Sequence, residues 1–215
     1  MKLISVNVGL PREVTSGGKT VRTSIWKNPI QGRVVVSKLN VYGDQQSNLA
    51  VHGGPNKAVY AYPSEHYSYW RSQLPDVDLP WGAFGENFTT EGLLEDQVRI
   101  GDRLRAGSAE FVVTQPRTPC FKLEIRFDGA DMIKRFLQTK RTGFYLAVLR
   151  EGEVAAGDTI ELGVRQESAL TITDIFNLYT VESDNQELLR RAAEQPGLPD
   201  SWKEYFRKRL WNADA

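Results

Sequence analysis

Glycine is distributed very unevenly along this 215-residue chain. Seventeen of its 18 glycines lie at or before Gly163, and only Gly197 follows. Because glycine adopts positive φ angles without steric cost, such a dense scatter indicates many tight turns between short segments. The distribution therefore predicts a turn-rich, strand-rich domain over residues 1–165 and a segment of different construction over 166–215.

The apolar runs before residue 165 are short and rich in β-branched and aromatic residues, which favour strands. They occupy residues 3–6, 34–36, 58–62, 111–113, 144–149 and 159–162. Two helices are expected between them: one over 63–71, with proline in its first turn, and one over 131–137, with one apolar face. We therefore predict a mainly β fold with α elements (α+β), folded as a compact β-barrel or a tightly bent sheet.

After residue 165 the apolar period changes to that of helices. Apolar side chains recur along one helical face over 172–179, 188–193 and 202–210. Asp184 and Ser201 each precede a glutamate by three residues, a spacing that predicts helix N-caps. We expect a small three-helix C-terminal extension that packs on the barrel or on a partner.

Charge and hydropathy exclude several classes of protein. The 27 basic and 27 acidic residues cancel, which argues against broad electrostatic binding to nucleic acid. No apolar run approaches the roughly 20 residues that span a bilayer, and the first residues lack a signal-peptide core. We expect a cytoplasmic protein that binds neither nucleic acid nor membranes.

Sulfur and imidazole are scarce, since the chain has one cysteine, Cys120, and two histidines, His52 and His66. One cysteine cannot form an internal disulfide or a multi-cysteine zinc or iron–sulfur site. Two histidines exclude a three-histidine metal site. Any sulfur chemistry must therefore take place at Cys120, which is expected to be a free thiol.

Residues 115–122 surround that cysteine. Pro116 and Pro119 lack backbone donors, so the preceding strand cannot continue as a central strand. We expect Cys120 on a stiff loop at a strand end, where Arg117 and Lys122 favour its thiolate, the form that attacks and binds metals. The alternative is a small buried apolar side chain beside two surface cations.

A glycine-rich segment covers residues 52–57. The backbone N–H groups of Gly53 and Gly54 can turn toward an anion, and Lys57 adds a positive charge. The segment is not a P-loop, because it has no second glycine at the P-loop spacing before Lys57 and no Ser/Thr after Lys57. The alternative is an ordinary turn in which His52 is a hydrogen-bonded structural histidine.

Residues 82–90 form a second glycine-rich segment. Asn87 can both donate to and accept from the edge of a heterocycle, and Thr89 or Thr90 can bind phosphate. Glu86 adds a carboxylate. The alternative is a polar loop between two strands.

These segments resemble a known family. The motifs "HGGPNKAVYAYP" (52–63), "GAFGENFTTEGLLEDQVRIGDRLRAG" (82–107), "TQPRTPCFKL" (114–123) and "TGFYLAVLREGEVAAGD" (142–158) occur in the order and separation found in MOSC (molybdenum cofactor sulfurase C-terminal) domain proteins, and look most like the YiiM-type branch. The resemblance implies a MOSC-type β-barrel domain over 1–165 and a three-helix extension over 166–215.

The resemblance also implies an enzyme: an oxidoreductase that uses the molybdenum cofactor (Mo-molybdopterin), with Cys120 as the thiolate ligand of the metal. Family members reduce N-hydroxylated compounds, including hydroxylamine-type base analogues and amidoximes, which amounts to detoxification. Their electrons come from a separate flavin or haem protein. Neither pyridoxal phosphate, zinc nor an iron–sulfur cluster is expected.

Further roles follow from residue type within the matching motifs. We expect His52 or Glu86 to deliver the proton that the reaction needs. Cofactor binding falls to residues that offer N–H groups, positive charge or an amide: Gly53, Gly54, Lys57, Arg117 and Asn87.

Three other functions compete with the reductase. The same cysteine suits a sulfur carrier or transferase that holds a Cys120 persulfide. A thiol hydrolase would pair Cys120 with His52 or His66. A non-enzymatic cofactor-binding module would need no chemistry at Cys120. The sequence predicts no particular oligomeric state.

Overall fold

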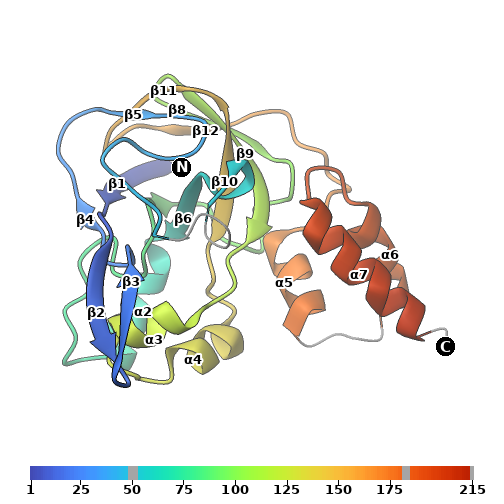
Figure 1. Cartoon of the computed structure of the whole chain (residues 1–215). Helices are drawn as coiled ribbons and strands as arrows, with labels where there is room; N and C mark the ends of the chain where they lie inside the picture. Colours follow the sequence, from blue (N-terminus) through green and yellow to red (C-terminus); the bar gives the residue numbers. More distant parts are fainter. Residues whose placement is uncertain (48–52, 181–184, 214–215) are drawn as a thin grey trace.

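The computed structural model describes residues 1–47, 53–180 and 185–213, and comprises a strand-rich domain with three helices beside it (Figure 1). The strands are β1 (Lys2–Val8), β2 (Arg12–Ser16), β3 (Lys19–Thr23), β4 (Asn28–Pro29), β5 (Val34–Val36), β6 (Val59–Pro63), β7 (Phe88–Glu91), β8 (Arg103–Ala106), β9 (Ala109–Pro116), β10 (Phe144–Arg150), β11 (Gly152–Val154) and β12 (Ile160–Leu162). The helices are η1 (Pro55–Lys57, a 3-10 turn), α2 (Glu65–Gln73), α3 (Phe121–Arg126), α4 (Met132–Thr139), α5 (Ile172–Thr180), α6 (Gln186–Glu194) and α7 (Asp200–Ala213). The predicted α+β class is confirmed.

The main sheet has eight strands in the order β12-β8-β9-β10-β6-β7-β1-β4. Neighbouring strands are antiparallel except β6 and β7, which are parallel. The two-stranded β2–β3 hairpin and the β5–β11 pair are separate sheets. Every apolar run predicted as a strand overlaps one of these strands, because β-branched and aromatic side chains fit a pleated, buried surface.

The main sheet is tightly bent but is not closed into a continuous barrel, so the structure has the second of the two predicted forms. Its two sides meet at a single isolated bridge among the described residues, between Lys2 and Thr159. Nearby, Leu3 N donates to Asp158 O at 2.9 Å, and Ile160 N donates to Met1 O at 3.0 Å. Because β12 has only three residues, these few bonds join the edges without forming a continuous ladder.

An aromatic cluster separates the sheet from the helices at one end of the domain. The rings of Trp70 in α2 and Phe136 in α4 stack with centroids 4.9 Å apart, and Phe84 packs against both. In Figure 1 the β2–β3 hairpin, α2, α3 and α4 gather at this end. The segment that follows β9 carries Cys120 and leads into α3 at this end.

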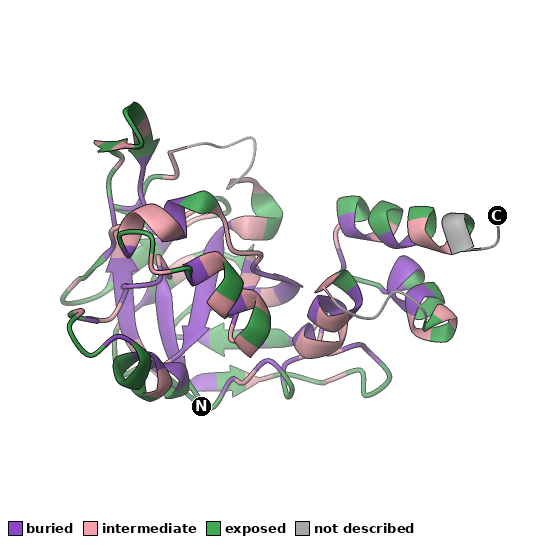
Figure 2. Ribbon diagram, turned by 90° about the horizontal axis from the view of Figure 1, so that it is seen from below, coloured by how far each residue is buried: buried purple, intermediate pink, exposed green. Residues whose placement is uncertain are grey.

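Helices α5 to α7 form the extension. Ile172 N donates to Val98 O at 2.9 Å, and α5 packs against β9, so the extension is attached through backbone contacts as well as side chains. Figure 2 shows buried residues in the sheet and on one side of these helices. Phe206 of α7 and Leu189 of α6 are fully buried. Within the described ranges, no helix is both long and apolar enough to cross a bilayer.

The two predicted N-caps of the extension need correction. In α6 the cap is Asn185, whose side chain accepts a hydrogen bond from Leu188 N at 3.0 Å. The predicted cap, Asp184, lies outside the described residues. Ser201 lies inside α7, which begins one residue earlier at Asp200. An asparagine side chain caps a helix as well as aspartate does, so the spacing to glutamate alone identified the wrong residue.

Candidate functional site

A cleft opens beside Cys120. Its lining comes from the connection between β3 and β4, from the segment after β5 and Lys57, from tyrosines of β6 and β10, and from the segment between Arg117 and Lys122. Phe84, Gly85 and Asn87 complete it. It encloses about 630 Å³ of empty space, including its open mouth.

Cys120 is a half-buried free thiol in this cleft. Its backbone is extended, with φ −132° and ψ 167°, and α3 begins at the next residue. Pro116 is the last residue of β9, so the predicted loop at a strand end is confirmed. Across residues 1–47, 53–180 and 185–213, no three His, Cys, Asp or Glu side chains cluster so as to hold a metal ion.

Arg117, which precedes Pro119 in the chain, also lines the cleft. Its side chain is buried, with the guanidinium carbon 5.3 Å from the Tyr60 ring centroid. Burial disfavours its charge, but the neighbouring Tyr60 phenol and Cys120 thiol raise the pKa of Arg117 overall. Its Nη1 atom is buried with no hydrogen-bond partner among the described residues, and so is the Ser24 hydroxyl. Two unsatisfied donors in one cleft indicate a polar ligand.

Two lysines add positive charge. Lys122 Nζ donates to Ser47 Oγ at 2.7 Å, and Lys57 Nζ lies 5.9 Å from the Tyr145 ring centroid. Burial lowers the pKa of both lysines. With Arg117, these side chains favour an anion in the cleft.

The glycines of the 52–57 segment act through the backbone. Gly54 has a φ of 93°, and its carbonyl accepts from Lys57 N at 3.0 Å as the chain turns into η1. This turn brings Lys57 to the cleft, whereas neither Gly53 nor Gly54 lines it. His52 lies outside the described residues.

A buried ion pair also lines the cleft. Lys27 Nζ lies 2.5 Å from Asp44 Oδ1, and Asn87 Nδ2 donates to Asp44 Oδ2 at 2.9 Å. Burial lowers the pKa of Lys27, and the charge of Asp44 opposes this. Asn87 therefore lines the cleft as predicted, but its amide is already hydrogen-bonded within the protein. Lys27 and Asp44 were not predicted, because they belong to no motif and lie 17 residues apart.

Glu86 does not line the cleft. Its buried carboxylate accepts hydrogen bonds from the hydroxyl of Tyr67, from Gly82 N at 2.8 Å, from Phe84 N at 3.1 Å and from Thr89 Oγ1 at 3.0 Å. Burial raises the pKa of Glu86. The structure thus places this predicted proton donor at the centre of the 82–89 loop, where it holds the loop together.

His66 is also remote from Cys120. It is buried in α2, and its Nε2 lies 2.8 Å from Glu95 Oε2. Neither residue lines the cleft. The arrangement does not assemble a Cys120–His66 pair of the kind a thiol hydrolase needs.

Comparison with known families identifies both parts of the chain. Residues 48–161 match the MOSC domain, and residues 170–212 match the YiiM-like 3-alpha helix domain. The first match covers the η1 turn, the 82–107 motif and the Cys120 segment. The second covers α5 to α7.

Whole-length relatives support this. The uncharacterized protein YflK of Bacillus subtilis is 38% identical over 207 residues, which cover 96% of this chain and 93% of YflK. Protein YiiM of Escherichia coli is 34% identical, over 87% of this chain and 84% of its own length. A Gibberella moniliformis protein named "Reductase" is 32% identical over 98% of this chain, which spans only 38% of that larger protein.

Solved structures agree. The crystal structure of YiiM from Geobacillus stearothermophilus matches with a TM-score of 0.82 and 39% identity, covering 97% of this chain and 98% of that one. YiiM from Escherichia coli matches with a TM-score of 0.77 and 28% identity, over 99% and 94% of the two chains. Because sequence motifs, the helical extension and the fold all agree over nearly the whole length, the chain belongs to the MOSC domain family, among its YiiM-like members.

Proposed function

We propose that this protein is a molybdenum-cofactor-dependent reductase of N-hydroxylated compounds, such as hydroxylamine-type base analogues and amidoximes. Membership of the MOSC family and the reductase name of one relative support an oxidoreductase. One observation carries the proposal furthest: the chain's only cysteine shares a positively charged cleft with Arg117, whose Nη1 is buried and unsatisfied.

The cleft residues suit such a cofactor. A pterin-bound molybdenum already carries sulfur ligands, and a thiolate is a soft ligand of the same kind. Cys120 would therefore ligate the metal. Arg117 and Lys57 would hold the phosphate of the pterin, and the Ser24 hydroxyl would satisfy a further polar atom.

When bound, the cofactor supplies the two electrons that cleave the N–O bond of the substrate. Reduction of a hydroxylamine to an amine and water also consumes two protons. Glu86 does not reach the cleft, whereas Lys27 lines it and is held in place by Asp44. We therefore add Lys27 to the predicted His52 as a proton donor. A separate flavin or haem protein would return the electrons, and detoxification would be the biological role.

The test uses protein made in a host that synthesises the cofactor. Molybdenum and pterin are quantified, and benzamidoxime reduction is assayed with a chemical reductant. Cys120→Ala is expected to lose bound molybdenum and the reductase activity. Thr118→Ala, which alters another cleft residue of the same loop, is expected to keep both. Full molybdenum content and full activity in Cys120→Ala would overturn the proposal.

The same preparations separate the competing functions. Cyanolysable sulfur on metal-free protein, lost in Cys120→Ala, would favour a sulfur carrier. Retained cofactor without turnover of any N-hydroxylated compound, unchanged in Cys120→Ser, would favour a binding module.

A further inference from the structure

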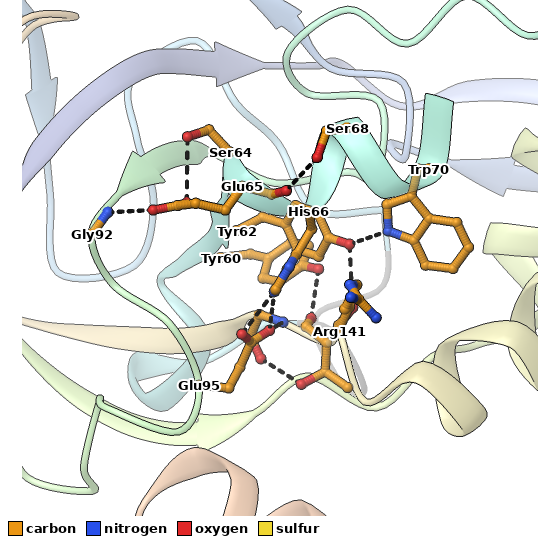
Figure 3. A network of polar contacts seen from close by, with 12 residues as sticks. Tyr60, Tyr62, Ser64, Glu65, His66, Ser68, Trp70, Gly92, Glu95 and Arg141 are labelled. Atoms are coloured by element: carbon orange, nitrogen blue, oxygen red, sulfur yellow. Dashed lines mark hydrogen bonds and ion pairs between the residues drawn. The ribbon is translucent and has the colours of Figure 1, made fainter. Parts of the chain in front are cut away.

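A buried carboxylate outside the cleft, that of Glu95, belongs to a polar network with His66 (Figure 3). The Glu95 residue is 5% exposed, and its Oε2 lies 2.8 Å from His66 Nε2. Its Oε1 accepts from Gly143 N at 2.7 Å. A carboxylate only accepts hydrogen bonds, so both neighbours act as donors to Glu95.

Gly143 in turn contacts the cleft segment, because its carbonyl accepts from Arg117 N at 3.2 Å. The residue before it is held as well: Tyr60 donates its hydroxyl to Thr142 O at 2.8 Å. The Tyr60 ring also faces the Arg117 guanidinium. Tyr60 therefore contacts both the loop before β10 and the Arg117 side chain.

Gly143 is closely packed on the side where a side chain would lie. Its φ is +64°, and a Cβ atom there would lie 2.4 Å from Ala61 O and 2.8 Å from Tyr60 Cε2. A backbone confined this closely transmits a displacement at its N–H group to the hydrogen bond at its carbonyl. The position of Glu95 is thus linked to the position of Arg117.

We propose that Glu95 is a positioning residue for the cleft: it holds Gly143 and, through Gly143, keeps Arg117 aimed at a bound phosphate. The inference rests on the proposed function in taking that phosphate to be the cofactor's. The main-chain carbonyl of Glu95 also accepts from Thr173 N of α5 at 3.0 Å. Glu95 therefore joins the three-helix extension to the same support.

Asp102 offers a matched control near the start of the extension. Asp102 is also buried, at 2% exposure, and pairs with Arg165 at 2.6 Å where the chain leads into the extension. Its carboxylate bonds to Arg99 N and not to Gly143. Asp102→Ala therefore removes a comparable buried carboxylate without touching the link to Arg117.

The test measures inorganic phosphate binding to the full-length, cofactor-free protein by calorimetry, together with amide hydrogen exchange. Glu95→Ala is expected to weaken phosphate binding about tenfold and to speed exchange at Gly143 and Arg117. Glu95→Gln, whose neutral oxygen still accepts from Gly143, is expected to lose about two- to threefold, because hydrogen bonds to charged acceptors are stronger. Asp102→Ala is expected to change neither quantity.

A double-mutant cycle separates positioning from general loosening. In an Arg117→Ala background, Glu95→Ala is expected to weaken phosphate binding no further. Unchanged binding in Glu95→Ala, or an equal loss with and without Arg117, would overturn the inference. If Glu95→Ala does not fold, Glu95→Gln decides by the same comparison.

The outcomes also separate this inference from the proposed function. If Arg117→Ala weakens phosphate binding and the Glu95 variants do not, only the positioning role fails. If Arg117→Ala itself has no effect, the phosphate cradle of the proposed function fails and the positioning role fails with it.

Discussion

Lys27 and Asp44 form a buried ion pair in the wall of the cleft, with 2.5 Å between Nζ and Oδ1. The Lys27 side chain is 8% exposed and the Asp44 side chain 1%. Asp44 is further held by Gly9 N and by Asn87. The pair joins the β3–β4 connection to the segment after β5, so it is part of what shapes the cleft.

Breaking this pair is expected to be costly. Asp44→Ala leaves the Lys27 ammonium buried without its partner, and we expect the free energy of unfolding to fall by about 3–5 kcal/mol. Urea unfolding measures this. Glu161→Ala removes the Arg105–Glu161 pair, which is exposed on both sides, and is expected to change stability little. Equal losses in the two variants would contradict the structural role of the buried pair.

The raised pKa of Glu86 predicts a specific pH dependence of folding stability. Burial raises its pKa in the folded protein, so the folded state holds the Glu86 proton to a higher pH than the unfolded state does. Its contribution to stability is complete below the ordinary glutamate pKa of about 4.3 and is lost as pH rises through the folded-state pKa. Above pH 4.3, urea midpoints of Glu86→Gln are expected to decline less with pH than those of the parent. Parallel curves would show that Glu86 has no raised pKa.

Arg117 is expected to lower the stability of the cofactor-free protein while it supports phosphate binding. Its buried Nη1 is unsatisfied, and a buried polar atom without a partner costs about 1–3 kcal/mol. Arg117→Met keeps an unbranched side-chain stem and removes that atom. We expect the cofactor-free variant to unfold at the parent's urea midpoint or above it, while losing phosphate binding. A lower midpoint together with intact phosphate binding would show that Arg117 is a structural residue.

Gly143 should tolerate no side chain. Gly143→Ala combines a positive φ with contacts as short as 2.4 Å to a backbone oxygen. Gly129 has a φ of +88° and nothing within 4 Å of the added carbon, so Gly129→Ala isolates the conformational cost. We expect about 1–2 kcal/mol for Gly129→Ala and about 1–3 kcal/mol more for Gly143→Ala, measured by urea unfolding. Similar losses would mean that the loop before β10 can shift.

Local sequence determined much of this protein. The apolar spacing that predicts strands and helices arises from the period of each element, so β1, β6, β9, β10 and β12 of the main sheet and α5 to α7 follow from it. The short strands β4, β7 and β8 of the same sheet were not predicted, because none of them is an apolar run. The loop that carries Cys120 was equally predictable, since Pro116 and Pro119 restrict their own backbone whatever surrounds them. The helix α3 was not predicted, because six residues carry too little periodicity to indicate one.

The members of the cleft were decided by the tertiary structure. Lys27 and Asp44 are brought together by the path of the chain, and no local pattern marks a pair whose interaction depends on shared burial. Glu86 and Asn87 show the point most clearly, because they are neighbours in one motif with opposite surroundings. Asn87 reaches Asp44 in the cleft, whereas Glu86 turns toward Tyr67 in α2. Successive side chains of an extended segment point to opposite sides, and only the packing of α2 on one side determines which of them faces the cleft.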